Sequence, residues 1–293
     1  MTTSLNYARP LDRPPLALAR VQPRHVNFLA LVHEMCSDAQ LQTALQVSGT
    51  ALLGVATDGV PLLIRLASPD VTHVLISGTK ASGKTEVART MLASLMLFQK
   101  PREIQLLVMD PKATAFQFLA HSPHLLGEIA ATPEHALQHL RWLESEMERR
   151  AKENVSRPRL VVVIDELAEF FSQAGREFQV HLARLAQNGR RVGISLIVCA
   201  TKANGSDLNA SLRANFPVRL GGKNANGNDG AEKLAGRGDF ILMAGGERVR
   251  FQAAYLAPED LPAFHAHVLE NHSRKNESAV GFSGFVKRLR RVK

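Results

Sequence analysis

Residues 73–85 have the sequence H-V-L-I-S-G-T-K-A-S-G-K-T, in which an apolar run leads into a glycine-containing loop. The loop carries the pattern G-x-x-x-x-G-K-[ST], with its fixed positions at Gly78, Gly83, Lys84 and Thr85. A helix-compatible run follows Thr85, so the pattern lies in the strand-loop-helix context that a phosphate-binding loop (P-loop) requires. The alternative interpretation is a glycine turn before a helix that carries an exposed lysine.

The chemistry of such a loop predicts a site for ATP and Mg²⁺. Backbone N–H groups and the helix N-terminus would face the phosphates. Lys84 would reach the β and γ phosphates as a catalytic residue, and the Thr85 hydroxyl would bind Mg²⁺. The nucleotide-binding residues predicted in this loop are Gly78, Thr79, Lys80, Ala81, Ser82, Gly83, Lys84 and Thr85.

A second chemical signal follows 80 residues after Thr85, where the run R-L-V-V-V-I ends in Asp165 and Glu166. Parallel sheets place their ligands at the carboxyl ends of the strands, so this acidic pair is expected beside the P-loop. Asp165 would hold Mg²⁺ together with Thr85, and Glu166 would orient or deprotonate the attacking water. The alternative is a strand end with two solvated carboxylates.

The pattern along the chain predicts an α/β fold. Short apolar runs, near residues 73–77, 104–109, 160–164, 194–199 and 240–243, alternate with helical segments. One helix is well marked, with Thr132 as its N-cap and Pro133 in its first turn. Such alternation is typical of a mostly parallel sheet flanked by helices. One or two helices are expected over residues 26–45, and a hairpin over residues 51–66 that turns at Asp58-Gly59.

Composition and charge bound the organisation of the chain. Of its 293 residues 45% are hydrophobic and 22% are charged, which is typical of a globular protein and argues against disorder. The net charge of +9 resides entirely in residues 1–30 and 272–293, because the residues between carry equal numbers of basic and acidic side chains. Polyanion affinity that follows from charge is therefore expected at the two ends.

We predict three parts: a Pro/Arg-rich arm with a short helical accessory segment (1–47), a motor domain (48–261) and a basic C-terminal tail (262–293). The prolines in the first 30 residues discourage regular structure there. Residues 221–230, G-G-K-N-A-N-G-N-D-G, are expected to form a loop. No apolar run is long enough to cross a membrane, and the two cysteines do not suggest a disulfide framework, so a cytoplasmic protein is expected.

The sequence resembles the motor domain of FtsK/SpoIIIE-type DNA translocases over residues 48–256. The likeness rests on segments that occur in the same order as in that family, namely V-M-D-P-K (108–112), H-S-P-H-L-L (121–126), L-R-W-L-E-S-E-M-E-R-R (140–150), V-V-V-I-D-E-L-A-E-F (161–170), L-A-R-L-A-Q-N-G-R-R-V-G-I (182–194), L-R-A-N-F-P-V-R (212–219) and G-A-E-K-L-A-G-R-G-D (230–239).

This resemblance implies a RecA-like core, of the FtsK/HerA group of ATPases, that assembles as a homo-oligomeric ring, usually a hexamer, around double-stranded DNA. It implies sequence-independent movement along DNA powered by ATP hydrolysis at sites between subunits. An arginine from the neighbour would complete each site, and Arg190 matches that position, with Arg191 as the alternative. Thr201 stands where the family has a glutamine that senses the γ-phosphate, so it is a further expected nucleotide contact.

The chain also departs from the family pattern. Lys80 and Ala81 replace a Thr-Gly pair in the P-loop, and Thr201 is shorter than the family's glutamine. Two alternative functions remain open.

The first is a protein-moving ATPase of the type VII secretion class. It is suggested by the resemblance of D-P-K-A-T-A-F (110–116) to that class, which has an aromatic residue after its Asp-x-Lys. A nucleotide-gated DNA-binding or assembly protein with weak turnover is suggested by Ala81 and Thr201.

Overall fold

The computed structural model describes residues 25–201, 208–223 and 230–273. Most of the Pro/Arg-rich arm, most of the glycine/asparagine loop and the tail from residue 274 onward lie outside the described residues, and so does the predicted surplus of charge at the two ends.

Within the described residues, ten strands form one sheet. Their bounds are β1 Val26–Asn27, β2 Thr50–Ala56, β3 Pro61–Arg65, β4 Val74–Ser77, β5 Ile104–Met109, β6 Arg159–Ile164, β7 Ile194–Ala200, β8 Val218–Gly221, β9 Asp239–Ala244 and β10 Glu247–Tyr255. The strand order is β3-β2-β10-β9-β8-β4-β7-β6-β5, and β1 pairs with β10. The half from β8 to β5 is parallel, whereas β9, β10, β2 and β3 continue the sheet with antiparallel pairing.

The helices connect and cover these strands. The α-helices are α1 Phe28–Cys36, α2 Ala39–Gln46, α3 Lys84–Phe98, α4 Pro133–Glu153, α5 Leu167–Asn188, α6 Ala210–Ala214 and α7 Leu261–Ser273. Short 3₁₀ turns are η1 Gln117–Leu119, η2 Gly189–Val192, η3 Ala231–Lys233 and η4 Pro258–Asp260. Helix α5 is interrupted at Gly175, whose φ of 63° is not helical.

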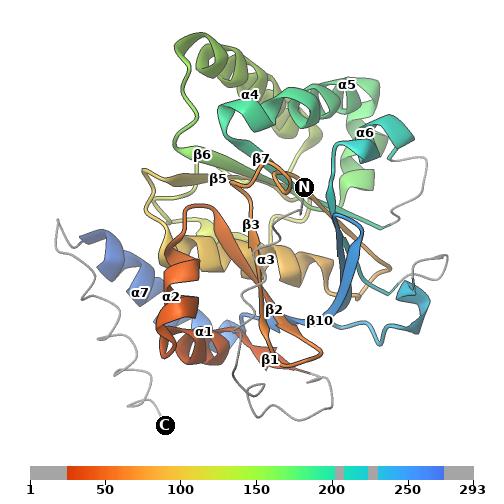
Figure 1. Ribbon diagram of the computed structural model, residues 1–293. Helices are drawn as coiled ribbons and strands as arrows, with labels where there is room; N and C mark the ends of the chain where they lie inside the picture. Colours follow the sequence, from red (N-terminus) through yellow and green to blue (C-terminus); the bar gives the residue numbers. More distant parts are fainter. Residues whose placement is uncertain (1–24, 202–207, 224–229, 274–293) are drawn as a thin grey trace.

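Two apolar layers sandwich the sheet. Helices α4 and α5 lie over one face and α3 lies over the other (Figure 1). Alternate residues of β4 enter different layers, because successive side chains of a strand point to opposite faces: Ile76 joins the layer of α3, α1 and α7, and Leu75 joins that of α4 and α5. Strand β4 is therefore buried on both sides, which fixes the start of the loop that follows it.

Helix α4 shows how local signals set an element. The Thr132 hydroxyl accepts a hydrogen bond from the His135 backbone N–H at 3.2 Å, and Pro133 opens the first turn. The helix ends at Asn154, which adopts a left-handed conformation with φ 54°. The start of this helix is the one that the sequence predicts.

Several predictions of the sequence are confirmed by this fold, among them the α/β class, the two N-terminal helices, the hairpin β2–β3 and the strands β4, β5, β6, β7 and β9. Strands β8 and β10 were not predicted. The first has only four residues, and the second carries charged side chains at Glu247, Arg248 and Arg250 that obscure its apolar pattern. No helix in the described ranges is both long and apolar enough to span a bilayer.

The ends of the described chain pack into the main core. Helix α7 occupies residues that the sequence assigns to a basic tail, yet its Phe264 and Val268 are buried in the layer that contains α3. Phe28 of α1 contacts Phe264 edge to face, with ring centroids 6.4 Å apart. The division of the chain into three parts stays a prediction.

One buried histidine predicts a pH dependence of stability. The Nδ1 atom of His73 accepts a hydrogen bond from the Leu196 N–H at 3.0 Å. Burial lowers the pKa of His73 from 6.5 to about 4. The unfolded chain thus binds this proton more readily, and the stabilising contribution is complete above pH 6.5 and is lost as pH falls toward 4.

We expect His73 to lower the free energy of unfolding by about 2 kcal/mol between pH 8 and pH 5. Urea unfolding at both pH values would measure it, and His73→Asn should reduce the pH dependence by that amount. The matched control is His121→Asn, at an exposed position, which should keep the parent's pH dependence. A His73→Asn variant with the parent's dependence would contradict the assignment.

Candidate nucleotide and magnesium site

The carboxyl ends of β5, β6, β7, β4 and β8 meet at one edge of the sheet, which follows from their parallel pairing. Ser77 of β4 pairs with Ala200 of β7, so Gly78 and Thr201 both leave the sheet at this edge. Strand β7 separates β4 from β6, which ends in Ile164 just before Asp165. The order therefore brings together three predicted segments that are distant in sequence.

The loop from Gly78 to Thr85 connects β4 to α3 as predicted. Gly83 is the N-cap of α3, with φ 101° and without a capping side chain. A Cβ atom at Gly83 would lie 2.8 Å from the Gly238 nitrogen, and one at Gly78 would lie 2.6 Å from Ser82 Oγ. These positions therefore require glycine for space as well as for backbone conformation.

Ala81 occupies the position at which the resemblance leads us to expect a glycine in the loop. It adopts φ 63°, in the left-handed region that favours glycine. The backbone thus keeps its glycine-like turn with an alanine present, at a conformational cost of about 1 kcal/mol. The substitution changes the energy of the loop rather than its path.

Two further segments of the chain form backbone hydrogen bonds with the loop. The Thr79 N–H donates to the Lys223 carbonyl at 2.7 Å, and the Gly238 N–H donates to the Ser82 carbonyl at 2.8 Å. Gly236, Arg237 and Gly238 all have positive φ, which makes the tight turn that fits against the loop. The contact of this G-R-G-D stretch with the P-loop was not predicted from the sequence.

Lys84 and Thr85 lie in the first turn of α3. The Lys84 ammonium is buried and donates to the carbonyl oxygens of Gly78 and Thr79, at 3.0 and 3.2 Å. The Thr85 hydroxyl donates to Asp165 Oδ2 at 2.8 Å. The hydroxyl and the carboxylate that the sequence predicts as Mg²⁺ ligands are therefore in direct contact.

The acidic pair follows β6. Asp165 is 3% exposed, and its burial raises its pKa, although the Thr85 hydroxyl counteracts the effect. Glu166 adopts a left-handed conformation with φ 48° at the start of α5. Its Oε1 lies 2.6 Å from the Lys112 ammonium, and this hydrogen bond lowers the pKa of Glu166. Lys112 was not predicted as a residue of the site, although D-P-K follows directly after β5.

These residues fit a magnesium-bound nucleoside triphosphate. Ser82 Oγ is buried at the base of the loop and has no hydrogen-bond partner among the described residues, as expected of a group that serves a ligand. Hydroxyl and carboxylate oxygens are the donors that Mg²⁺ prefers, usually with phosphate oxygens and waters as its other ligands. Thr201 is exposed directly after β7, between the P-loop and the acidic pair.

Arg190 and Arg191 lie elsewhere. They are exposed in η2, which precedes β7 and so lies at the opposite edge of the sheet from the P-loop. Neither side chain is part of the site that this chain forms by itself.

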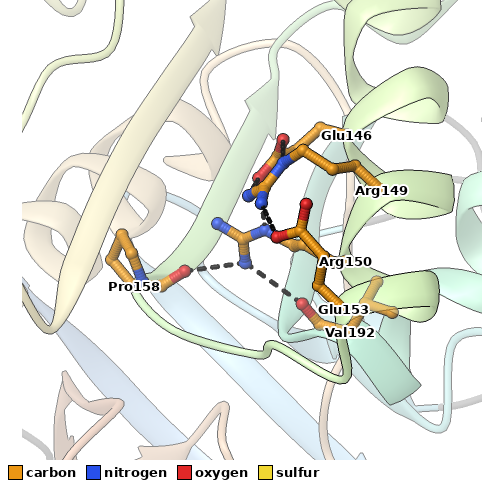
Figure 2. A network of polar contacts seen from close by, with 6 residues as sticks. All are labelled: Glu146, Arg149, Arg150, Glu153, Pro158 and Val192. Carbon is orange, nitrogen blue, oxygen red and sulfur yellow. Dashed lines mark hydrogen bonds and ion pairs between the residues drawn. The ribbon is translucent and has the colours of Figure 1, made fainter.

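A buried arginine fixes the turn that carries them, as Figure 2 shows. Arg150 of α4 donates to the Val192 carbonyl at 3.1 Å and to the Pro158 carbonyl at 2.8 Å. Its Nε donates to Glu146 at 2.6 Å, and Glu146 also pairs with Arg149, which in turn contacts Glu153. Arg150 is 3% exposed, and its buried guanidinium ties the end of η2 to α4 and to the segment that leads into β6.

Strand order, P-loop and acidic pair together define a RecA-like P-loop ATPase fold. Comparison with known proteins agrees. Residues 31–155 match the model of the FtsK/SpoIIIE family. The DNA translocase SftA of Bacillus subtilis is 30% identical over 250 residues, covering 75% of this chain and 26% of SftA. The DNA translocase FtsK of Treponema pallidum is 30% identical over 275 residues, covering 83% of this chain and 34% of that protein.

The predicted resemblance to FtsK/SpoIIIE-type DNA translocases is confirmed by these matches. The chain spans about a quarter to a third of the length of these curated relatives.

Solved structures support the fold. The pCW3 conjugation coupling protein TcpA, solved in a monomer form with ATPγS, has a TM-score of 0.67 at 19% identity, covering 86% of this chain and 75% of TcpA. EccC of Thermomonospora curvata, solved with a signal sequence peptide, has a TM-score of 0.65 at 19% identity, covering 81% of this chain and 44% of that one. At such identities the likeness concerns the fold alone.

Proposed function

We propose that this chain is the motor of an ATP-driven translocase of double-stranded DNA, which acts as a homo-oligomeric ring, most simply a hexamer. The observation that carries the proposal is the convergence of Lys84, Thr85, Asp165 and Glu166 at one sheet edge, in a chain whose curated relatives are named DNA translocases. In bacteria such as Bacillus subtilis and Treponema pallidum, whose DNA translocases this chain resembles, duplex DNA lies in the cytoplasm, so the proposed activity places the motor there.

Each residue of the site has a proposed task. The amides of the loop and Lys84 bind the phosphates, and Thr85 and Asp165 hold Mg²⁺, which when bound neutralises phosphate charge. Glu166 accepts a proton from the water whose oxygen bonds to the γ-phosphorus, while the bond from that phosphorus to the ADP oxygen breaks. Thr201 contacts the γ-phosphate from the end of β7.

We place a neighbour's Arg190 at the site as the group that stabilises charge on the transferred phosphoryl group. The support for an intersubunit role is its position: it is exposed at the far edge of the sheet, on a turn that Arg150 fixes. An exposed arginine that lies away from its own site, on a turn whose backbone is held by Arg150, is suited to serve the next site in a ring.

Subunit mixing tests this role. Arg190→Ala and Lys84→Ala should each be inactive alone, with a loss of about 1,000-fold for the arginine. Mixed in equal amounts, they should regain ATPase activity, because a subunit with an intact P-loop then receives Arg190 from a Lys84→Ala neighbour. Arg191→Ala is the matched variant and should retain activity. Mixtures that remain inactive would contradict the intersubunit assignment of Arg190.

A protein-moving ATPase is the second candidate. The aromatic residue that favours it, Phe116 of the D-P-K-A-T-A-F segment, is buried in the apolar layer that contains α3. Steady-state ATP hydrolysis with and without linear duplex DNA separates the two. The proposed function predicts a rate that rises several-fold with DNA and that loses this stimulation at high salt, because contacts to phosphates weaken there. A rate that is indifferent to DNA at low salt would contradict it.

A further inference from the structure

Glu166 has a partner that the proposed reaction does not use. The Lys112 ammonium lies 2.6 Å from Glu166 Oε1, and the two residues come from loops after adjacent strands, β5 and β6. The other charges near them are Lys80 and Lys84 beside Glu166, and Asp165 and Glu169 beside Lys112. Lys112 is the cation that forms the direct contact.

The loop that presents Lys112 is firmly built. Asp110 is 1% exposed, and its carboxylate accepts hydrogen bonds from the N–H groups of Lys112 and Ala115, both at 3.0 Å. Ala113 adopts φ 51° to close the turn, and its N–H donates to the Asp110 carbonyl at 3.0 Å. The backbone of Lys112 is therefore fixed at the sheet edge, whereas its side chain is 59% exposed and can change partner.

A carboxylate in this contact is poorly placed to act as a general base. One of its oxygens is occupied by the ammonium, so the side chain is drawn toward Lys112, and the base must instead reach the water that attacks the phosphate. The contact is nevertheless easy to open, because an ion pair between partly exposed side chains contributes little to stability. Its strength suits a reversible restraint rather than a permanent one.

We propose that Lys112 is a positioning residue that restrains Glu166 in the resting enzyme and releases it when the site engages DNA-bound neighbours. The proposal rests on the proposed function, in which Glu166 is the base. Lys112 thereby keeps ATP hydrolysis low in the absence of DNA, and part of the stimulation by DNA is the loss of this one contact.

The test uses the full chain and compares kcat and KM for ATP with and without linear duplex DNA. Lys112→Met should raise the DNA-free kcat about two- to fivefold, the range that a weak ion pair allows, with KM unchanged. The fold stimulation by DNA should fall by the same factor. Lys112→Gln should behave in the same way, and Lys112→Arg should restore the low DNA-free rate, because it keeps the charge.

Lys152→Met is the matched control, since Lys152 is an exposed lysine at the end of α4, and it should match the parent. A DNA-free kcat of Lys112→Met that equals or falls below the parent's, in a folded variant that binds ATP normally, would overturn the restraint. Glu166→Gln distinguishes a failure of the proposed function from a failure of the proposed restraint by Lys112. If it hydrolyses ATP as fast as the parent, the proposed function fails. If it is inactive while Lys112→Met matches the parent, only the restraint fails.

Discussion

Glu166→Gln is expected to lower the kcat of ATP hydrolysis by at least about 100-fold while ATP binding is retained. Glutamine has nearly the same shape as glutamate but cannot accept a proton, so the change removes the general base and leaves the P-loop intact. Steady-state hydrolysis with saturating duplex DNA and equilibrium binding of a fluorescent ATP analogue measure the two effects.

The change should cost little stability. It removes the contact with Lys112, which is exposed and contributes at most about 1 kcal/mol. Asp165→Asn serves as a companion variant, because it should weaken Mg²⁺ binding instead of removing the base. If the parent and Glu166→Gln hydrolyse ATP equally slowly, the motor assignment is wrong, and the nucleotide-gated DNA-binding alternative gains support.

Lys84→Ala is expected to weaken ATP binding by at least about tenfold and to reduce hydrolysis to background. Lys84 is buried and donates to two loop carbonyls, so its ammonium is held at the place where the phosphates would lie. Removal deletes both a charge and a charge-assisted hydrogen bond to the phosphates. Titration with an ATP analogue and a thermal unfolding curve would measure binding and folding in the same sample.

Lys84→Arg is the informative control for that result. A guanidinium keeps the charge but is larger and planar. It should not fit the place where the Lys84 ammonium contacts the carbonyl oxygens of Gly78 and Thr79, and so it should not restore activity. A Lys84→Ala variant that is folded and binds ATP as tightly as the parent would contradict the role of this loop as the nucleotide site.

The sequence predicted the parts of the fold whose signals are local. The apolar run before Gly78 and the run before Asp165 are both buried strands in the structure, and α4 begins where Thr132 and Pro133 indicate. Strand order was beyond such reasoning. It depends on pairing between distant segments, and nothing in the local pattern places β7 between β4 and β6.

In the site, too, the residues with local sequence signals were predicted, and those that depend on contacts between distant segments were not. Thr85 and Asp165 were each predicted to bind Mg²⁺ from separate motifs, and the fold places their side chains 2.8 Å apart. Lys112 and the turn at Arg237 were missed as neighbours of the site, because their role depends on which loops meet at the sheet edge. Arg190 stays a prediction, since its proposed partner is another copy of the chain.

Ala81 and Thr201 bear on whether the proposed motor hydrolyses ATP efficiently. The φ of 63° at Ala81 shows that the loop adopts its turn despite the missing glycine, so this departure does not by itself argue for a site without function. Thr201 is at the expected place, after β7, but its side chain is shorter than the glutamine of the related translocases. Coupling between hydrolysis and movement is therefore the step that most needs a direct assay.

Displacement of a labelled third strand from linear duplex DNA measures that coupling most directly, because a moving motor strips the third strand and a static one does not. The parent with ATP and Mg²⁺ should release the strand over time, whereas Glu166→Gln with ATP, or the parent with a slowly hydrolysed analogue, should leave it bound. Hydrolysis of ATP by the parent without any strand release above the Glu166→Gln background would contradict the proposal that this chain drives movement along duplex DNA.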